Sequence, residues 1–282
     1  MHERIYQNAV VLAKKFGNAP LTLLNKPVGK DASYGYEASD EDFLSRQWAK
    51  ETGAYYFDLN DFLEAVHLGN TEKIENYKKQ LQDKKKIITS SLILFTNKEQ
   101  TALGADHWVS LFTELKDIWA NPSLDERRIV LPLSLTFGLG QHAAVACLNF
   151  KPAQKSVDVI FIEQHAQKKG TPDYNPQIDY TDGLKLHEYW FGSLCKNFVG
   201  METVNTFKND EAISHRRKVC GVIATEVARQ LLATADPMKL AKSGIKISDA
   251  EVDTLHARNQ ELEAKYGPLP LEIIHQNGGK NV

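Results

Sequence analysis

The chain has 282 residues, 42% of them hydrophobic, so it is long enough to bury a sizeable core and to fold alone. Its formal net charge of −2 gives no global attraction to nucleic acid or to anionic membranes, so any recognition through charge must be local. Three cysteines without metal-type spacing leave at least one thiol unpaired, which argues against a secreted disulfide framework and for a reducing compartment.

The N-terminal part of the chain is predicted to be helical. Residues 1–18 indicate an amphipathic helix rather than a signal peptide, and no apolar stretch reaches membrane-spanning length. We therefore expect a cytoplasmic protein, or one delivered into a host cytosol without a general secretory signal. Further helices are expected to begin at a capping-box-like Ser39 to Asp42 and at the caps Asn60 and Thr71.

From Ile87 onward, short apolar runs rich in Ile, Val and Phe predict buried strands. These runs are IITSSLILF, WVSLF, IVLPLSL, AAVACLNF and VDVIFIE. Because they follow one another closely, consecutive strands should pair in a mixed or antiparallel central sheet flanked by helices, which is an α+β fold. The predicted domains are a helical region over 1–85, an α+β core over 86–240, and a C-terminal helix and tail over 241–282.

Four further elements are predicted before the tail. A helix is expected over LKLHEYWFGSLCKNF, a strand over METVNTF, and a second helix from Cys220 to near Asp236. The last helix begins at a capping box, Ser248 to Glu251, and ends near Tyr266.

The stretch RKVCGVIATEVARQLL places Cys220 at the predicted start of a helix, directly after basic residues. A helix N-terminus and nearby cations both stabilise a thiolate, so Cys220 is a candidate nucleophile. Gly221 would let a backbone N–H approach an oxyanion. The alternative is that Cys220 is a small buried hydrophobe. Cys147 and Cys195 lie in apolar or amphipathic segments and are interpreted as core residues.

A histidine and a carboxylate lie near the ends of two predicted strands that should pair. His142 opens one strand and Glu163 closes the next. If the turn between them is centred near residues 153–154, Glu163 faces Ala144 and lies diagonal to His142 on the same face of the sheet. A base with an orienting carboxylate is the arrangement that activates a thiol nucleophile.

The order of these residues resembles that of the adenain-like, or clan CE, cysteine peptidases, in which a histidine opens a strand, an acid ends the next strand and a Cys-Gly pair begins a helix. This group includes ubiquitin-like-protein proteases, bacterial effector deubiquitinases and YopJ-type acetyltransferases. The resemblance covers roughly residues 127–235. It implies a papain-like core in which Cys220 is the nucleophile, His142 the general base and Glu163 the orienting acid.

One departure from the family pattern concerns the oxyanion donor. The family usually has a glutamine about six positions before the cysteine, whereas this chain has Ser214 there and His215 next to it. The candidate donors are therefore Ser214, His215 and Gly221. Losing one such donor typically costs about 10² to 10³ in rate.

A second departure concerns the residue after the histidine, which is often Trp in the family but is Ala143 here. The stretch GADHWVSLF does contain a His-Trp pair, so His107 is a rival catalytic histidine. We favour His142, because only that residue is followed at the right distance by a strand that ends in a carboxylate. The remaining histidines lack metal-ligand spacing, so no metal site is expected.

The resemblance implies a thiol hydrolase that cleaves ubiquitin or a ubiquitin-like modifier from target proteins through an acyl-enzyme at Cys220, with no cofactor. Bacterial effectors that act in a host cell belong to the same group. The first alternative is a YopJ-type protein acetyltransferase, which would use the same triad with acetyl-CoA and inositol hexakisphosphate. The second is a non-enzymatic interaction protein with a degenerate site, whose helical N-terminal region binds the partner.

Overall fold

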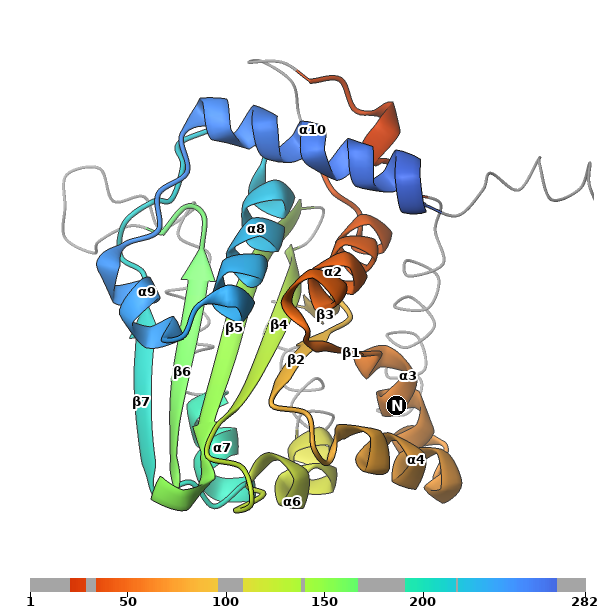
Figure 1. The fold of residues 1–282 in the computed structure, drawn as a ribbon, viewed down its shortest axis with the longest axis vertical. Helices are drawn as coiled ribbons and strands as arrows, with labels where there is room; N and C mark the ends of the chain where they lie inside the picture. Colours follow the sequence, from red (N-terminus) through yellow and green to blue (C-terminus); the bar gives the residue numbers. More distant parts are fainter. Residues whose placement is uncertain are drawn as a thin grey trace, which may run out of the picture.

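A mixed seven-stranded sheet forms the centre of the molecule (Figure 1). The computed structural model describes residues 21–28, 34–95, 109–137, 140–166, 191–216 and 218–267. The strands are β1 (Tyr55–Phe57), β2 (Lys86–Thr89), β3 (Leu92–Phe95), β4 (Arg127–Phe137), β5 (Gly140–Lys151), β6 (Ser156–Glu163) and β7 (Thr203–Lys208). They are ordered β1-β2-β4-β5-β6-β7, with β3 also paired to β4. The predicted α+β fold with a mixed central sheet is confirmed.

The middle of the sheet is antiparallel. β4 pairs with β5 along its whole length, and β5 pairs with β6 after a short 3-10 turn, η2 (Pro152–Gln154). The register places Ala144 opposite Glu163, as predicted from the position of the turn. β2, β3 and β7 are parallel to their neighbours in this unit, and β1 is parallel to β2.

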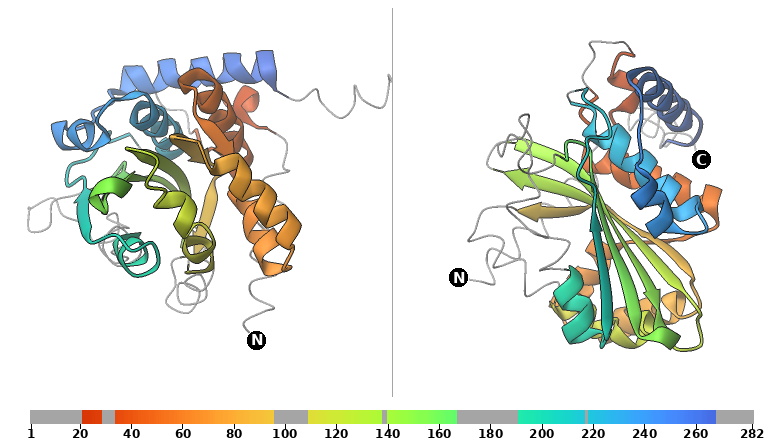
Figure 2. Two further views of the ribbon diagram at one scale, coloured as in Figure 1. Left: turned by 60° about the horizontal axis from the view of Figure 1, so that its bottom comes forward. Right: turned by 90° about the vertical axis from the view of Figure 1, so that its left-hand side faces the viewer.

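Helices cover both faces of the sheet, which lies between them in both views of Figure 2. One face carries α2 (Ala38–Thr52), α8 (Cys220–Ala233), α9 (Pro237–Ser243) and α10 (Asp249–Tyr266). The other face carries α3 (Leu59–His67), α4 (Thr71–Leu81), α6 (Lys116–Trp119) and α7 (Ser193–Phe198). The 3-10 turn η1 (Leu23–Asn25) packs against α10.

Because both faces of the sheet are covered, its central strands are buried on both sides and read as continuous apolar runs. Along β5, Val145 and Cys147 face α8, while Ala144 and Leu148 face the opposite core. Cys147 and Cys195 are both fully buried, which confirms their interpretation as core residues. Burial raises the pKa of the Cys147 thiol to about 12 and raises that of Cys195 as well, so both thiols stay protonated.

Two predicted strands differ in the structure. The run WVSLF is not a strand, because residues 109–114 are helical and pack Leu111 and Phe112 into the core as one helix face. The run IITSSLILF forms two strands, β2 and β3, which are separated at Ser90 and Ser91. The Ser90 hydroxyl accepts a hydrogen bond from the Leu59 N–H at the start of α3, and the Ser91 hydroxyl donates to Glu41 of α2, so both side chains bond helix starts.

The predicted helix starts are nearly right. The capping box of Ser248 and Glu251 at the start of α10 is confirmed. α2 begins earlier than expected, with Glu37 rather than Ser39 as its N-cap, and α3 and α4 are capped by Asp58 and Asn70 rather than by Asn60 and Thr71. The side chains of Asp58 and Asn70 each accept a hydrogen bond from the backbone N–H three residues later.

The described part of residues 1–85 is largely helical but also contributes β1 to the edge of the sheet. The division of the chain at residues 85 and 240 stays a prediction. Within the described ranges, no helix combines the length and the apolar character needed to cross a membrane.

Candidate active site

Cys220 is the first residue of α8, as the sequence predicts, and it is partly exposed. The chain enters the helix through a sharp turn in which Lys218 has a left-handed φ of 59°, a conformation that costs free energy for a residue with a side chain. The Lys218 carbonyl accepts a hydrogen bond of 3.0 Å from the Tyr34 N–H. The segment before α2 therefore holds the turn that presents the thiol.

His142 and Glu163 meet at the end of the β5–β6 pair. The Nε2 atom of His142 lies 2.9 Å from Oε1 of Glu163, and both side chains are buried. The same carboxylate oxygen accepts a hydrogen bond of 3.0 Å from the backbone N–H of His165. Since Nε2 faces the carboxylate, Nδ1 is the ring nitrogen that can serve the thiol.

The electrostatics of Cys220 and His142 favour an ion pair. Burial alone would raise the pKa of the Cys220 thiol, but the hydrogen bond and charge of His142, with the N–H groups of Ala143 and Gly221, hold the pKa below its ordinary value. Burial alone would lower the pKa of His142, but its contacts with Cys220 and Glu163 raise it to about 9. The arrangement stabilises a thiolate beside an imidazolium.

The structure thus brings together Cys220, His142 and Glu163, the three residues that the sequence singles out. The rival His107 lies outside the described residues. The order of a histidine at a strand start, an acid at the end of the antiparallel neighbour and a cysteine at a helix start is present, so the fold resembles that of the clan CE peptidases. Among the described residues, no cluster of three or more His, Cys, Asp or Glu side chains could hold a metal ion.

No protein-family profile and no curated protein matches the sequence. Among solved structures, the chain is similar to the ASFV pS273R protease, with 12% identity, 60% of this chain and 58% of that chain covered, and a TM-score of 0.35. It is also similar to the Legionella pneumophila effector protein RavZ (10% identity, 59% and 49% covered, TM-score 0.37). A second RavZ structure, in complex with human LC3B, has 11% identity, 60% and 44% coverage and a TM-score of 0.36. The chain spans about half the length of these proteins.

Two of the predicted oxyanion donors, Ser214 and His215, lie in the segment that leads into α8. The Ser214 hydroxyl lies 3.4 Å from Oδ1 of Asp249 and accepts a hydrogen bond from the Arg216 N–H. His215 is exposed. Arg216, from the basic run before the cysteine, forms an ion pair of 2.6 Å with Asp253 of α10. His142 and backbone N–H groups, rather than this arginine, therefore lower the pKa of the thiol.

Gly221 serves a packing role that the sequence does not indicate. A Cβ atom added to this residue would lie 2.5 Å from the Cβ of Tyr36, closer than such atoms ever approach. The missing side chain therefore lets the segment before α2 press against the start of α8. The Gly221 N–H also contributes to the low pKa of the thiol, so the two roles coexist.

Asn209, directly after β7, holds Glu163 by its backbone. Its side-chain amide donates to the Glu163 carbonyl at 2.8 Å, and its side-chain oxygen accepts from the Glu163 N–H at 3.0 Å. β7 ends at Lys208, so beyond that residue the Asn209 side chain, instead of a strand backbone, bonds the Glu163 backbone at the edge of β6. We identify Asn209 as a positioning residue for the acid.

Gln164, next to the acid, connects it to the cysteine loop. Its side-chain amide donates to the backbone carbonyls of Ser214 and Arg216 at 3.4 and 2.6 Å, and its backbone carbonyl accepts a hydrogen bond from the Ile213 N–H. The end of β6 is thus bonded to the segment that leads into α8. These bonds fix the acid and the nucleophile relative to each other.

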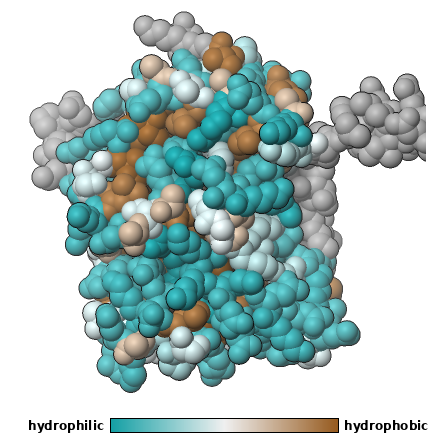
Figure 3. Space-filling view, viewed as in Figure 1, coloured by the Kyte–Doolittle hydropathy of each residue, from teal (hydrophilic) through white to brown (hydrophobic). Residues whose placement is uncertain are grey.

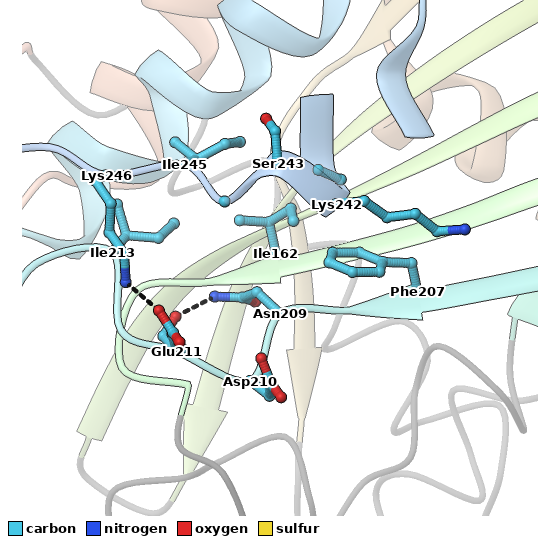
Figure 4. A pocket seen from close by; sticks show the side chains of 12 residues that line it. Ile162, Phe207, Asn209, Asp210, Glu211, Ile213, Lys242, Ser243, Ile245 and Lys246 are labelled. Carbon is cyan, nitrogen blue, oxygen red and sulfur yellow. Dashed lines mark hydrogen bonds and ion pairs between the residues drawn. The ribbon is translucent and has the colours of Figure 1, made fainter. Parts of the chain in front are cut away.

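A pocket of about 230 Å³ lies between α9 and the ends of β6 and β7 (Figure 4). Its floor is apolar and is formed by Ile162, Phe207, Ile213 and Ile245. Figure 3 shows apolar surface at this place, between α8 and α9. Asn209 lines the pocket, and its side-chain amide also donates a hydrogen bond to the Glu211 carbonyl. The residue that holds the Glu163 backbone therefore forms part of the pocket wall.

Sequence reasoning missed Asn209 and the position of His165. The His165 ring stacks on that of His142, with ring centroids 5.7 Å apart. The sequence signal that could have indicated His165 is its position two residues after the predicted acid, Glu163. Asn209 gives no such signal, because its contact with Glu163 depends on the parallel pairing of β6 and β7.

Proposed function

We propose that this protein is a thiol hydrolase that cleaves ubiquitin or a ubiquitin-like modifier from target proteins. The observation that carries the proposal is the contact of His142 with both the Cys220 thiol and the Glu163 carboxylate, at the start of a helix packed on the sheet. This is the arrangement of nucleophile, base and orienting acid that acyl transfer to a thiol requires. The choice of a ubiquitin-like substrate comes from the resemblance to clan CE.

In the proposed reaction, the Cys220 thiolate attacks the carbonyl carbon of the scissile amide and a tetrahedral oxyanion forms. The His142 imidazolium then gives its proton to the leaving amine, the C–N bond breaks and a thioester remains on Cys220. His142, now neutral, takes a proton from water, which attacks the thioester and releases the acid. Glu163 keeps the imidazole oriented and stabilises its charged form throughout.

Two alternatives are separated from this proposal by different observations. A degenerate, non-enzymatic site would be favoured by His142 and Glu163 on opposite faces of the sheet, whereas these side chains lie 2.9 Å apart. A YopJ-type acetyltransferase would use the same three residues, with acetyl-CoA as the acyl donor. The choice between hydrolysis and acetyl transfer therefore rests on which acyl donor reacts with Cys220.

The test is intact-mass spectrometry of the full chain after incubation with modifiers that carry a C-terminal thiol-reactive electrophile. A panel of ubiquitin and ubiquitin-like proteins, LC3B among them, would cover the proposed substrate class. We expect one adduct on the wild type and none on Cys220→Ala. Cys147→Ala is the matched control and should keep the adduct, because that thiol is buried in the core.

The possible outcomes lead to different conclusions. An adduct with one modifier names the substrate, and cleavage of the corresponding conjugate then measures turnover. No adduct, together with an acetyl mass on Cys220 after incubation with acetyl-CoA, would replace hydrolysis by acetyl transfer. Adducts that persist in Cys220→Ala would show that the wrong nucleophile has been assigned.

A further inference from the structure

α10 turns a polar face toward the two chain segments that border Cys220. Figure 1 shows the helix crossing above α8 and α2, and it lies outside the residues 127–235 that resemble the family. The polar residues of this face recur at helical spacing and bond either the loop before α8 or the segment before α2; they are Asp249, Asp253, His256, Asn259 and Gln260. His256 and Asn259 are buried there. Because buried polar groups are costly unless they are bonded, this face is a reason to ask what it holds in place.

Asp253 joins one residue of each segment. Its Oδ1 atom accepts a hydrogen bond of 2.6 Å from the Tyr34 hydroxyl and forms an ion pair of 2.6 Å with Nη1 of Arg216. The Arg216 guanidinium also lies over the Tyr34 ring, 4.8 Å from its centroid. The Arg216 side chain is only 7% exposed, and a charge so far removed from water requires a charged partner. Asp253, Tyr34 and Arg216 therefore form one bonded unit between α10 and the two segments.

This unit holds the turn that leads into the nucleophile. The Tyr34 backbone N–H donates a hydrogen bond of 3.0 Å to the Lys218 carbonyl, and Arg216 lies two residues before Lys218 in the same loop. Lys218 has a left-handed φ of 59°, a conformation that persists only where the surrounding structure holds it. Only Val219 separates Lys218 from Cys220. The turn is therefore anchored to α10 through its backbone at Tyr34 and through the arginine that precedes it.

The residue after the nucleophile is held from the same helix. Tyr36 packs closely on Gly221. Its hydroxyl lies 3.0 Å from Nδ1 of His256 and accepts a hydrogen bond of 2.9 Å from the Asn259 amide. Nε2 of His256 lies 3.2 Å from the Lys26 carbonyl, which can only accept, so in the neutral ring Nε2 carries the proton and the Tyr36 hydroxyl donates to Nδ1. α10 thus holds the segment that contacts the chain on both sides of the nucleophile.

We propose that Asp253 is a positioning residue for the nucleophile, Cys220, whose thiol it keeps within reach of His142. It does so by binding Tyr34 and Arg216, which hold the turn before the thiol. The inference rests on the proposed function, in which this cysteine is the nucleophile, and it makes α10 part of the catalytic unit. A misplacement of about 1 Å can cost about 10²-fold in rate, so the order of this turn bears directly on catalysis.

The test measures alkylation of Cys220 by iodoacetamide from about pH 5 to pH 10, because this reaction needs the thiolate but no acyl substrate. The full chain is used as wild type, Asp253→Ala, Asp253→Asn, Tyr34→Phe and Arg258→Ala. Cys220→Ala gives the background, and thermal unfolding checks that each variant folds. Arg258→Ala is the matched control, because Arg258 also joins α10 to α8 by an ion pair, 3.0 Å from Glu226, but six residues beyond the nucleophile.

We expect Asp253→Ala to move the midpoint of the alkylation profile upward by about one pH unit, which lowers the rate below that midpoint by about tenfold. A displaced turn separates the thiol from His142, and burial alone then raises the pKa of Cys220. The loss of a carboxylate would, through its charge alone, make the thiolate easier to form. An upward shift therefore reports displacement of the thiol and not the lost charge.

The other variants should follow the bonds that they keep. Asp253→Asn should stay within about threefold of the wild type, because its Oδ1 atom can still accept both hydrogen bonds. Tyr34→Phe keeps the ring and the backbone N–H but loses the hydroxyl, so its midpoint should move upward by less than that of Asp253→Ala. Arg258→Ala should leave the midpoint unchanged, even where it lowers the stability of the fold.

Three results would overturn the proposal. A folded Asp253→Ala with an unchanged or lowered midpoint would show that the turn does not depend on this residue. Equal shifts in Asp253→Ala and Arg258→Ala would assign the effect to the docking of α10 in general. If Asp253→Ala does not fold, an unchanged midpoint in Tyr34→Phe would reject the proposal in its place. Because iodoacetamide makes no demand on a ubiquitin-like substrate, a wild type that is alkylated but reacts with no modifier probe refutes the proposed substrate class and leaves the role of Asp253 tested.

Discussion

The two sides of the candidate site are built in different ways. His142 and Glu163 come from one antiparallel pair, β5 and β6, whose connecting turn fixes the register. Cys220 comes from the start of α8, which packs closely against Tyr36 because Gly221 has no side chain, and α8 shares an apolar core with α2. The strand side is determined locally, whereas the helix side depends on contacts between distant parts of the chain.

Because of this difference, substitutions on the two sides of the site should impair the protein in different ways. A register fixed by a turn tolerates substitutions elsewhere, since a slip would turn every side chain of the strand to the other face. The start of α8 is sensitive at the Gly221 contact, because protein interiors are packed without spare volume. We therefore expect the strand side to fail through loss of a functional group and the helix side through loss of packing.

The largest effect is expected on the strand side, at the base. His142→Ala should lower the rate of conjugate cleavage by about 10⁴-fold or more, because the thiol loses both its base and its ion-pair partner. The pH profile of iodoacetamide alkylation would then shift upward, since burial alone raises the pKa of Cys220. An unchanged alkylation profile would contradict the ion pair between His142 and Cys220.

The next prediction tests whether Glu163 depends on the two hydrogen bonds that Asn209 makes with its backbone. Asn209→Ala should lower kcat by about 10- to 100-fold with little change in KM, because Glu163 loses two bonds that hold its backbone. The alkaline limb of the pH profile should move down, since a displaced Glu163 no longer supports the raised pKa of His142. The matched variant is Asn205→Ala, four residues earlier and within β7, where the side chain bonds Asp158 instead; this variant should keep kcat. A loss of stability without any shift of the limb would make Asn209 merely structural.

The third prediction addresses the helix side through Gly221. Gly221→Ala should destabilise the fold by about 1 to 3 kcal/mol, because the added methyl group overlaps Tyr36. Gly35→Ala is the control: a Cβ there meets no atom within 4 Å, and the free energy of unfolding should change little. Denaturant unfolding measures both. Equal stability of the two variants would show that Tyr36, before α2, does not press on the start of α8 as described.

The last prediction concerns the change in the free energy of unfolding per pH unit that Glu41 of α2 contributes. The folded pKa of Glu41 lies at about 8, above its ordinary value of 4.5, so between these pH values the unfolded chain loses a proton that the folded chain keeps. The free energy of unfolding should therefore fall with rising pH, by at most about 1.4 kcal/mol per pH unit from this group. Glu41→Gln should flatten that slope in denaturant titrations at pH 5 to 8. A slope equal to that of the wild type would contradict the raised pKa.

The sequence predicts the strand side of the site better than the contacts between distant parts of the chain. The β5–β6 register and the pairing of Ala144 with Glu163 were predictable, because a short turn between two apolar runs leaves one register that buries both. The placement of Cys220 at a helix start was predictable from the apolar spacing after it. Asn209 and the packing role of Gly221 were not, because their partners are set by parallel strand pairing and helix docking across long stretches of chain.

The errors have a physical cause as well. WVSLF has the composition of a strand, but its apolar residues meet the core on one side of a helix, and a five-residue run cannot distinguish the two. IITSSLILF looked continuous because serine is compatible with a strand, whereas Ser90 and Ser91 bond helix starts and interrupt it.

The contact between Tyr36 and Gly221 also bears on when the protein can become active during its synthesis. Tyr36 leaves the ribosome well before Gly221, by roughly 10 to 40 s at ordinary rates of elongation over the 221 − 36 = 185 intervening residues. Until Gly221 emerges, the segment before α2 has no α8 to pack against, and its apolar side chains stay without their partners. The reactive thiol acquires its surroundings only when the segment before α2 packs against α8, so no competent site can form before α8 has been synthesised.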